Sequence, residues 1–145
     1  MRKPNFTQGN ALYFTKNCST IGVLEVVRMS ESKLRTQSRD FAVSIINLVK
    51  TLKEKRETII SNQIGRSGTS IGANIREAQY AHGKADFIAK LQIALKEANE
   101  TGYWLELLFR TNYITEENYK SLDSACTSIR VMLISSINTA KENMN

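Results

Sequence analysis

Apolar side chains recur along the chain with the spacing of helix faces, in four separate stretches. Residues 33–54, 57–82, 85–111 and 116–142 each carry apolar positions three or four residues apart, which places them on one side of an α-helix. No stretch alternates apolar and polar residues as a half-buried strand would. The pattern therefore predicts an all-α protein built from four long helices.

The predicted core is the apolar stripe of each helix. The stripes comprise Phe41, Ile45, Leu48, Val49 and Leu52; Ile60, Ile64, Ile71, Ile75 and Ala78; Phe87, Leu91, Leu95, Ala98, Leu105 and Phe109; and Leu122, Cys126, Ile129, Leu133, Ile137 and Ala140.

The joins between these stretches are short and carry helix-ending signals. Lys53–Arg56 is a polar join, and Gly83 is a natural stop for the second helix. Thr115 can cap the fourth helix, with Glu116 and Glu117 at the positive end of its dipole. Long helices with short joins pack as neighbours running in opposite directions, so we expect an antiparallel up-down four-helix bundle.

The first 28 residues fit this pattern less well. They are rich in Asn and Thr, with only the short apolar stretch Val23–Val27, and Met29 followed by Ser-Glu-Ser resembles a chain start. We expect residues 1–28 to be a loosely ordered or extraneous extension and residues 29–145 to form the bundle.

Composition excludes several classes of protein. A chain of 145 residues with one Pro, seven Gly and 41% hydrophobic residues is neither fibrous nor disordered. Two cysteines, Cys18 and Cys126, cannot build a disulfide framework, and the single His82 rules out a two-histidine metal site in one chain. No apolar run has the length of a membrane span, and we expect no signal peptide. We expect a cytoplasmic protein without a cofactor or a metal.

Charge is concentrated in the first predicted helix. Residues 33–56 hold seven basic and two acidic side chains, a net charge of +5 in a chain whose total is +6. At about 100° per residue, Arg35, Arg39, Lys50 and Lys53 fall within an arc of about 60° beside the apolar stripe. We expect this basic ridge to bind nucleic acid, although such a row can also be a solvated helix face.

The second and third predicted helices each carry a second stripe facing away from the apolar one. Ile93, Trp104 and Leu108 on this stripe would lie on the surface of a monomer, and such apolar surface usually marks an interface. The alternative is a broad core that absorbs the stripe. We expect self-association through a subunit interface formed by Arg66, Glu77, Tyr80, Lys90, Ile93, Glu97, Glu100, Trp104 and Leu108.

Three glycines share one flank of the second helix. Gly65, Gly68 and Gly72 each cost about 1 kcal/mol relative to Ala inside a helix, so they indicate close approach of another helix. A phosphate-binding loop is the weaker interpretation, since neither a Gly-Lys-Ser/Thr motif nor a preceding strand accompanies them.

Catalytic chemistry finds little support in the residue pattern. Glu97 and Glu100 lie one turn apart, and with Asp86 they could form a magnesium nuclease site, but no base or positioned nucleophile accompanies them. Ion pairs with Lys90, Arg66 or Arg76 are the simpler interpretation. We therefore expect no enzymatic activity.

One long motif resembles a known family. It reads Arg66-Ser-Gly-Thr-Ser-Ile-Gly-Ala-Asn-Ile-Arg-Glu-Ala78, followed by Ala85-Asp86-Phe87-Ile88 and Lys96-Glu97-Ala98 with Tyr103-Trp104-Leu105. With these motifs, residues 33–140 resemble the bacterial four-helix-bundle family encoded in 23S rRNA intervening sequences. One departure is Gly83, where the family often has Ser.

The resemblance implies further properties. It implies a bundle that assembles as a homopentameric ring and has no known enzymatic activity. A related branch, the accessory variability protein of diversity-generating retroelements, is a basic pentamer that binds nucleic acid and works with a reverse transcriptase. Carried onto this chain, the family's signature positions are Arg66, Asn74, Glu77, Glu97, Glu100 and Trp104.

Two functions of different classes follow. The first is a non-enzymatic homo-oligomer that binds RNA or DNA backbone through the basic ridge, as an accessory to a reverse transcriptase or in an rRNA intervening-sequence context. The second is a structural or protein-interaction adaptor in which the charge serves only solubility.

Overall fold

The computed structural model describes the backbone of residues 21–143 and the side chains of residues 33–143. This part of the chain is all-α, with helices α1 (Ile21–Glu54), α2 (Ile59–Ala78), α3 (Lys84–Arg110) and α4 (Glu116–Glu142) and no strand. The prediction of an all-α protein with four helices is confirmed. None of these helices combines the length and the apolarity that a membrane crossing requires.

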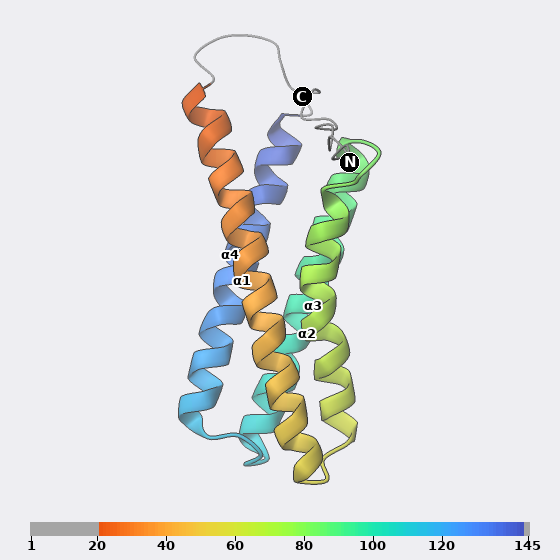
Figure 1. Cartoon of the computed structure of the whole chain (residues 1–145), viewed down its shortest axis with the longest axis vertical. Coiled ribbons are helices and arrows are strands. Elements are labelled where there is room, and N and C mark those ends of the chain that lie inside the picture. The colour runs from red at the N-terminus through yellow and green to blue at the C-terminus, as the bar shows by residue number, and fades with distance from the viewer. Residues whose placement is uncertain (1–20, 144–145) are drawn as a thin grey trace, which may run out of the picture.

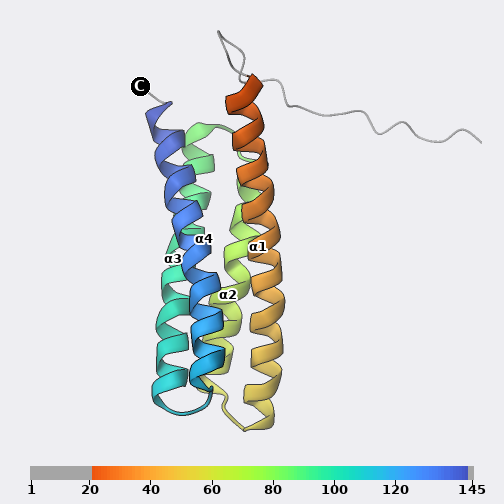
Figure 2. The same cartoon turned by 90° about the vertical axis from the view of Figure 1, so that its left-hand side faces the viewer.

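The four helices lie side by side along the long axis of the molecule (Figure 1), and each packs against two others. The α1–α2 and α3–α4 connections lie at one end and the α2–α3 connection lies at the other (Figures 1 and 2). Contacts join α1 to α2, α2 to α3, α3 to α4 and α4 back to α1, which closes the bundle.

Two helix boundaries differ from the predicted ones by more than two residues. The first helix begins at Ile21, twelve residues before the predicted start. Of the expected extension, residues 1–28, the first twenty lie outside the described residues and residues 21–28 belong to α1. The second helix ends at Ala78, because the next backbone N–H groups turn back to oxygens three residues earlier. Its predicted extension to residue 82 is therefore wrong, whereas the fourth helix has its predicted bounds.

Capping side chains explain where α2 and α4 begin. The Thr115 hydroxyl accepts a hydrogen bond from the Asn118 N–H (3.2 Å), as predicted for an N-cap. At α2 the buried Glu57 carboxylate accepts three backbone N–H groups, those of Ile59 (3.0 Å), Ile60 (2.9 Å) and Ser61 (2.7 Å). A negative charge here satisfies donors that the helix leaves free and complements its dipole.

The two connections at the lower end of Figure 1 begin with the same backbone motif. Arg56 and Asn112 both have φ of 60°. Each donates its N–H to the carbonyl oxygen three residues earlier. The N–H of the next residue reaches back five positions, to Leu52 O after α1 and to Leu108 O after α3, at 2.9 Å in both cases. This Schellman arrangement closes α1 and α3.

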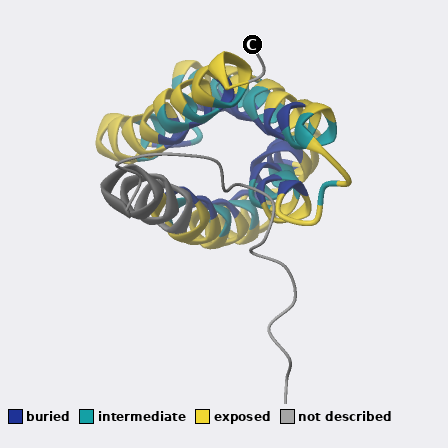
Figure 3. Ribbon diagram, turned by 90° about the horizontal axis from the view of Figure 1, so that it is seen from above, coloured by how far each residue is buried: buried dark blue, intermediate teal, exposed yellow. Residues whose placement is uncertain are grey.

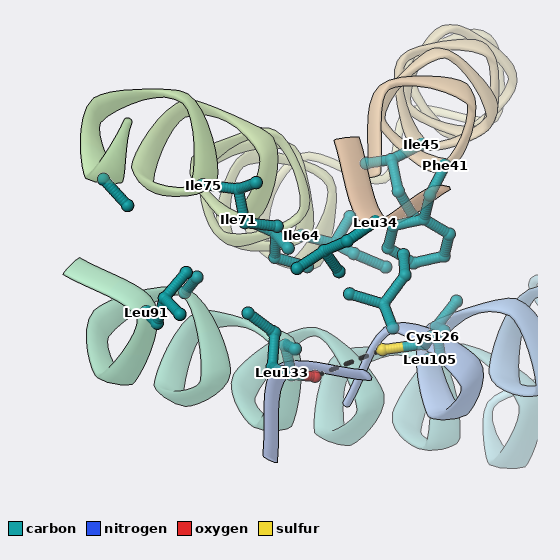
Figure 4. Packing of buried hydrophobic residues seen from close by; sticks show 14 of the residues in the cluster. Leu34, Phe41, Ile45, Ile64, Ile71, Ile75, Leu91, Leu105, Cys126 and Leu133 are labelled. Carbon is teal, nitrogen blue, oxygen red and sulfur yellow. Dashed lines mark hydrogen bonds between the residues drawn. The ribbon is translucent and has the colours of Figure 1, made fainter. Parts of the chain in front are cut away.

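The core lies along the axis of the bundle. Viewed from above, the buried residues face the centre and the exposed residues face outward (Figure 3). Isoleucines dominate the contribution of α2, and the labelled side chains from all four helices meet in Figure 4. Phe41, Ile45 and Leu52 of α1 are buried as predicted.

Helix α1 packs closely against the glycines of α2. A Cβ atom at Gly68 would lie 2.9 Å from both Cγ atoms of Ile45, which is itself fully buried. The nearest atoms to a Cβ at Gly65 and Gly72 would be Val49 Cγ2 at 3.3 Å and the Ser38 carbonyl oxygen at 3.5 Å. The close packing predicted for this flank is confirmed.

This geometry predicts opposite effects for two glycine substitutions. Gly68→Ala should lower the free energy of unfolding by about 1–2 kcal/mol, because the stiff Ile45 side chain must move and the overpacking outweighs the gain in helix propensity. Gly72→Ala should raise it by about 0.5–1 kcal/mol, since its methyl group meets only an ordinary contact. Urea denaturation of both variants is the measurement; equal stabilisation by the two would contradict the close approach at Gly68.

Candidate nucleic-acid surface and subunit interface

The basic ridge lies on the outside of α1. Arg35, Arg39, Lys50 and Lys53 are all exposed, because the core residues of the helix lie on another of its sides. Arg39 Nε lies 3.2 Å from the Asp40 carboxylate, and both side chains of this pair are more than half exposed. Within residues 33–143, the other three cations of the ridge form no ion pair. Most of the positive charge of the ridge is therefore not neutralised by the described part of the chain.

The centre of the ridge is apolar. Ala42 and Ile46 continue the row between Arg39 and Lys50, and Ile46 is 45% exposed. The neighbouring Val43 is 53% exposed. The ridge thus has two basic ends separated by a section without charge; one end is Arg35 with Arg39, and the other is Lys50 with Lys53.

Arg76 of α2 adds a cation that sequence reasoning did not place with the ridge. Gly72 lies against Ser38, so one turn further along α2 brings Arg76 to the level of Arg35 on the flank that faces α1. Arg76 is exposed and forms no ion pair within the described residues. The signal available in the sequence was its position four residues after Gly72 on the glycine flank.

Arg66 joins two carboxylates of α3. Its Nη1 lies 3.2 Å from Glu97 Oε2, and its Nη2 forms an ion pair with Glu100. The Trp104 indole N–H donates to the same Glu100 carboxylate (3.2 Å). Hydrogen bonds from Arg66 and, to a lesser degree, from Trp104 hold the pKa of Glu100 below its ordinary value, and the Glu100 carboxylate raises the pKa of Arg66. The cluster connects α2 to α3 within one chain.

A second ion pair lies nearer the α2–α3 connection. Lys90 Nζ is 2.6 Å from Glu77 Oε2, and this hydrogen bond raises the pKa of Lys90. Ile93 and Tyr80 are exposed, at 42% and 84%. Of the apolar and aromatic members of the proposed interface, these two are the most available to a partner.

Leu108 does not lie on the outer stripe. It is fully buried in the core of the single chain, because α3 packs against both α2 and α4 and its buried arc is wide. The prediction that Leu108 would be left on a monomer's surface is therefore wrong. Trp104 is half-buried and packs against the core, with its ring centroid 4.9 Å from that of the exposed Tyr103.

The other candidate groups have structural roles. Asp86 Oδ2 accepts the His82 backbone N–H (3.1 Å) and so secures the start of α3. The buried Cys126 thiol donates to the Ala98 carbonyl oxygen (3.3 Å), and burial raises the pKa of this thiol to about 11 (Figure 4). No group of three or more His, Cys, Asp or Glu side chains in the described part of the chain could hold a metal ion.

The α2–α3 ion-pair cluster predicts a pH-dependent loss of stability in Glu100→Gln. The pKa of Glu100 is lowered in the folded protein, so its ionised form stabilises the fold above the ordinary carboxyl pKa, about 4.3. This contribution disappears as the pH falls through the lowered pKa. Glu100→Gln should therefore be less stable by at most about 1 kcal/mol at neutral pH, since the carboxylate is partly solvated.

The measurement is urea denaturation of wild type and Glu100→Gln at a series of pH values. The difference between them should shrink below pH about 4. Glu106→Gln, which removes the exposed pair with Arg110, is the matched control and should change stability less. A difference that stays constant with pH would contradict an ionised Glu100 as its source.

The chain is similar to a known protein over most of its length. A crystal structure of a protein of unknown function from the S23 ribosomal protein family of Bacteroides thetaiotaomicron VPI-5482 is similar to this chain, with 57% identity and a TM-score of 0.74. The match covers 75% of this chain and 98% of the other. No match was found among curated proteins. Residues 30–135 match the family described as 23S rRNA-intervening sequence protein, and the chain belongs to this family.

Proposed function

We propose that the protein is a non-catalytic homo-oligomer that binds the backbone of RNA or DNA through the basic ridge of α1. The observation that carries this proposal is the row of exposed cations Arg35, Arg39, Lys50 and Lys53, of which only Arg39 has an acidic partner within residues 33–143. Cations without intramolecular partners are available to phosphates. Contacts of this kind position a protein on nucleic acid without reading its sequence, so binding should tolerate sequence changes.

The proposed assembly is a pentameric ring of antiparallel up-down bundles. Connections at alternate ends support the antiparallel order, and the family resemblance supports the pentamer. The exposed Tyr80 and Ile93 each follow a member of the Glu77–Lys90 ion pair by three residues, and they support contact through α2 and α3. Five copies would carry a formal charge of about +30, which favours strong, salt-dependent binding to polyanions.

A non-catalytic role is supported by the state of the carboxylates. Glu97 and Glu100 both bind Arg66, and the lowered pKa of Glu100 keeps it ionised at neutral pH. Because Arg66 is bound to both carboxylates, this cluster is suited to joining α2 and α3. We also propose a cytoplasmic location, because the proposed nucleic-acid ligand is found there.

The second candidate function is a protein-interaction adaptor, with a reverse transcriptase as one candidate partner. The observation that favours it is exposed apolar surface on all four helices, at Val43 of α1, Ile59 of α2, Ile93 of α3 and Val131 of α4. Binding of labelled RNA by the purified protein separates the two candidates, because an adaptor has no need to bind it.

Replacing the four ridge cations tests the proposal. The quadruple variant Arg35→Gln, Arg39→Gln, Lys50→Gln, Lys53→Gln should bind structured RNA at least about 10-fold more weakly at moderate salt, with a salt slope smaller by about one per cation removed. Fluorescence anisotropy at two salt concentrations measures both quantities. Lys120→Gln with Lys141→Gln, which removes two cations from α4, is the control for loss of charge outside the ridge. Unchanged affinity and slope in the quadruple variant would remove the ridge from the proposal.

Light scattering tests the assembly. Wild type should have a mass of several 16.4 kDa chains, and Ile93→Glu should lower it because a buried charge would face the partner copy. Val131→Glu on the outside of α4 is the control, since it makes the same change at an exposed apolar residue away from the α2–α3 surface. A single 16.4 kDa particle at micromolar concentration for wild type would contradict self-association.

A further inference from the structure

The arrangement of charge along the basic ridge distinguishes between kinds of nucleic acid. We infer that the ligand of the ridge is a double helix whose two strands contact the two basic ends of α1, with the apolar centre lying over the groove between them. This inference rests on the proposed function and adds the class of ligand to it.

The basic ridge is interrupted at its centre. Ala42 and Ile46 separate its two basic ends. The eleven residues from Arg39 to Lys50 correspond to about 16 Å along the helix. A flexible single strand that followed α1 would pass this section without any cation to meet its phosphates.

The phosphates of a duplex are also interrupted, by the grooves between its two strands. The two strands border a groove in which no phosphate lies, and the major groove of B-form DNA is about 12 Å wide. Two cation pairs about 16 Å apart along a rigid rod can therefore reach both borders at once, because Arg and Lys side chains extend several ångströms from the backbone. In A-form RNA the wide, shallow minor groove offers a comparable surface.

The described part of the ridge has no exposed aromatic side chain on which bases could stack. Surfaces that bind single strands combine cations with exposed aromatic side chains on which bases stack. From residue 33 to the end of α1 the one aromatic residue is Phe41, which is 3% exposed, and α2 contains none. The exposed aromatic residues Tyr80 and Tyr103 lie outside these two helices, after α2 and on α3. The ridge thus has cations that can bind phosphates and no exposed aromatic side chain on which bases could stack.

Arg76 strengthens one end of the ridge. It lies at the level of Arg35 on the neighbouring helix, so this end presents cations from both α1 and α2. A strand that crosses α1 runs from one helix towards the other. Arg35 and Arg76, side by side on the two helices, can therefore contact neighbouring phosphates of that strand. Arg76→Gln should therefore weaken duplex binding in the same way as the ridge variants.

The test compares four probes of about two helical turns (roughly 20 base pairs or nucleotides). The probes are an RNA duplex, a DNA duplex and the corresponding single strands, each titrated against the full-length protein by fluorescence anisotropy. At least one duplex should bind at least about 10-fold more tightly than its single strand. The RNA and DNA arms identify which double helix is preferred.

Variants at the two ends and at the centre test the geometry. Arg35→Gln with Arg39→Gln, and Lys50→Gln with Lys53→Gln, should each reduce the salt slope for the preferred duplex by about two. Ile46→Lys should leave this slope unchanged, because the centre faces the groove. A slope that rises by about one in Ile46→Lys would overturn the groove-spanning arrangement.

The outcomes separate this inference from the proposed function. If single strands bind as tightly as duplexes and the ridge variants weaken both, the double-helix inference fails while the nucleic-acid role stands. Loss of single-strand binding in Tyr80→Ala, with single strands preferred, would likewise overturn the inference. If no probe binds, or if affinity and salt slope are unchanged in every ridge variant, the proposed function itself fails.

Discussion

The approach of Ile45 to Gly68 determines how α1 sits on the bundle. Because no Cβ is present at Gly68, the branched Ile45 side chain occupies that space and is completely buried. With Ile45 directed inward, the helical repeat places Arg35, Arg39 and Lys50 on an outer flank. The outward direction of the positive charge is thus a consequence of how two apolar helix faces fit together.

The two surfaces of the molecule use charge differently. Between α2 and α3, Arg66 and Lys90 meet carboxylates of the same chain, so their charges are satisfied before any partner arrives. On α1, Lys50 and Lys53 have no such partner among the described residues. A surface with paired charges holds the fold together, whereas unpaired cations attract a polyanion.

Helix periodicity predicted the fold well because every helix has a buried stripe of its own. Thr115 also marked the start of α4 through a local signal, its own side chain. Leu108 was misplaced because periodicity does not show how wide the buried side of a helix is. In α3 this side is wide, since both α2 and α4 cover it. Arg76 could not be assigned to the ridge from the sequence. Its place follows from the packing of Gly72 against Ser38, two residues 34 positions apart, and a local pattern does not show such a contact.

The buried Cys126 has a practical consequence. Its thiol is enclosed by the bundle and hydrogen-bonded to α3, and its high pKa leaves almost no thiolate at neutral pH. An alkylating reagent can modify this sulfur only when α4 separates from α3. The rate at which Cys126 is modified therefore reports how often the bundle opens.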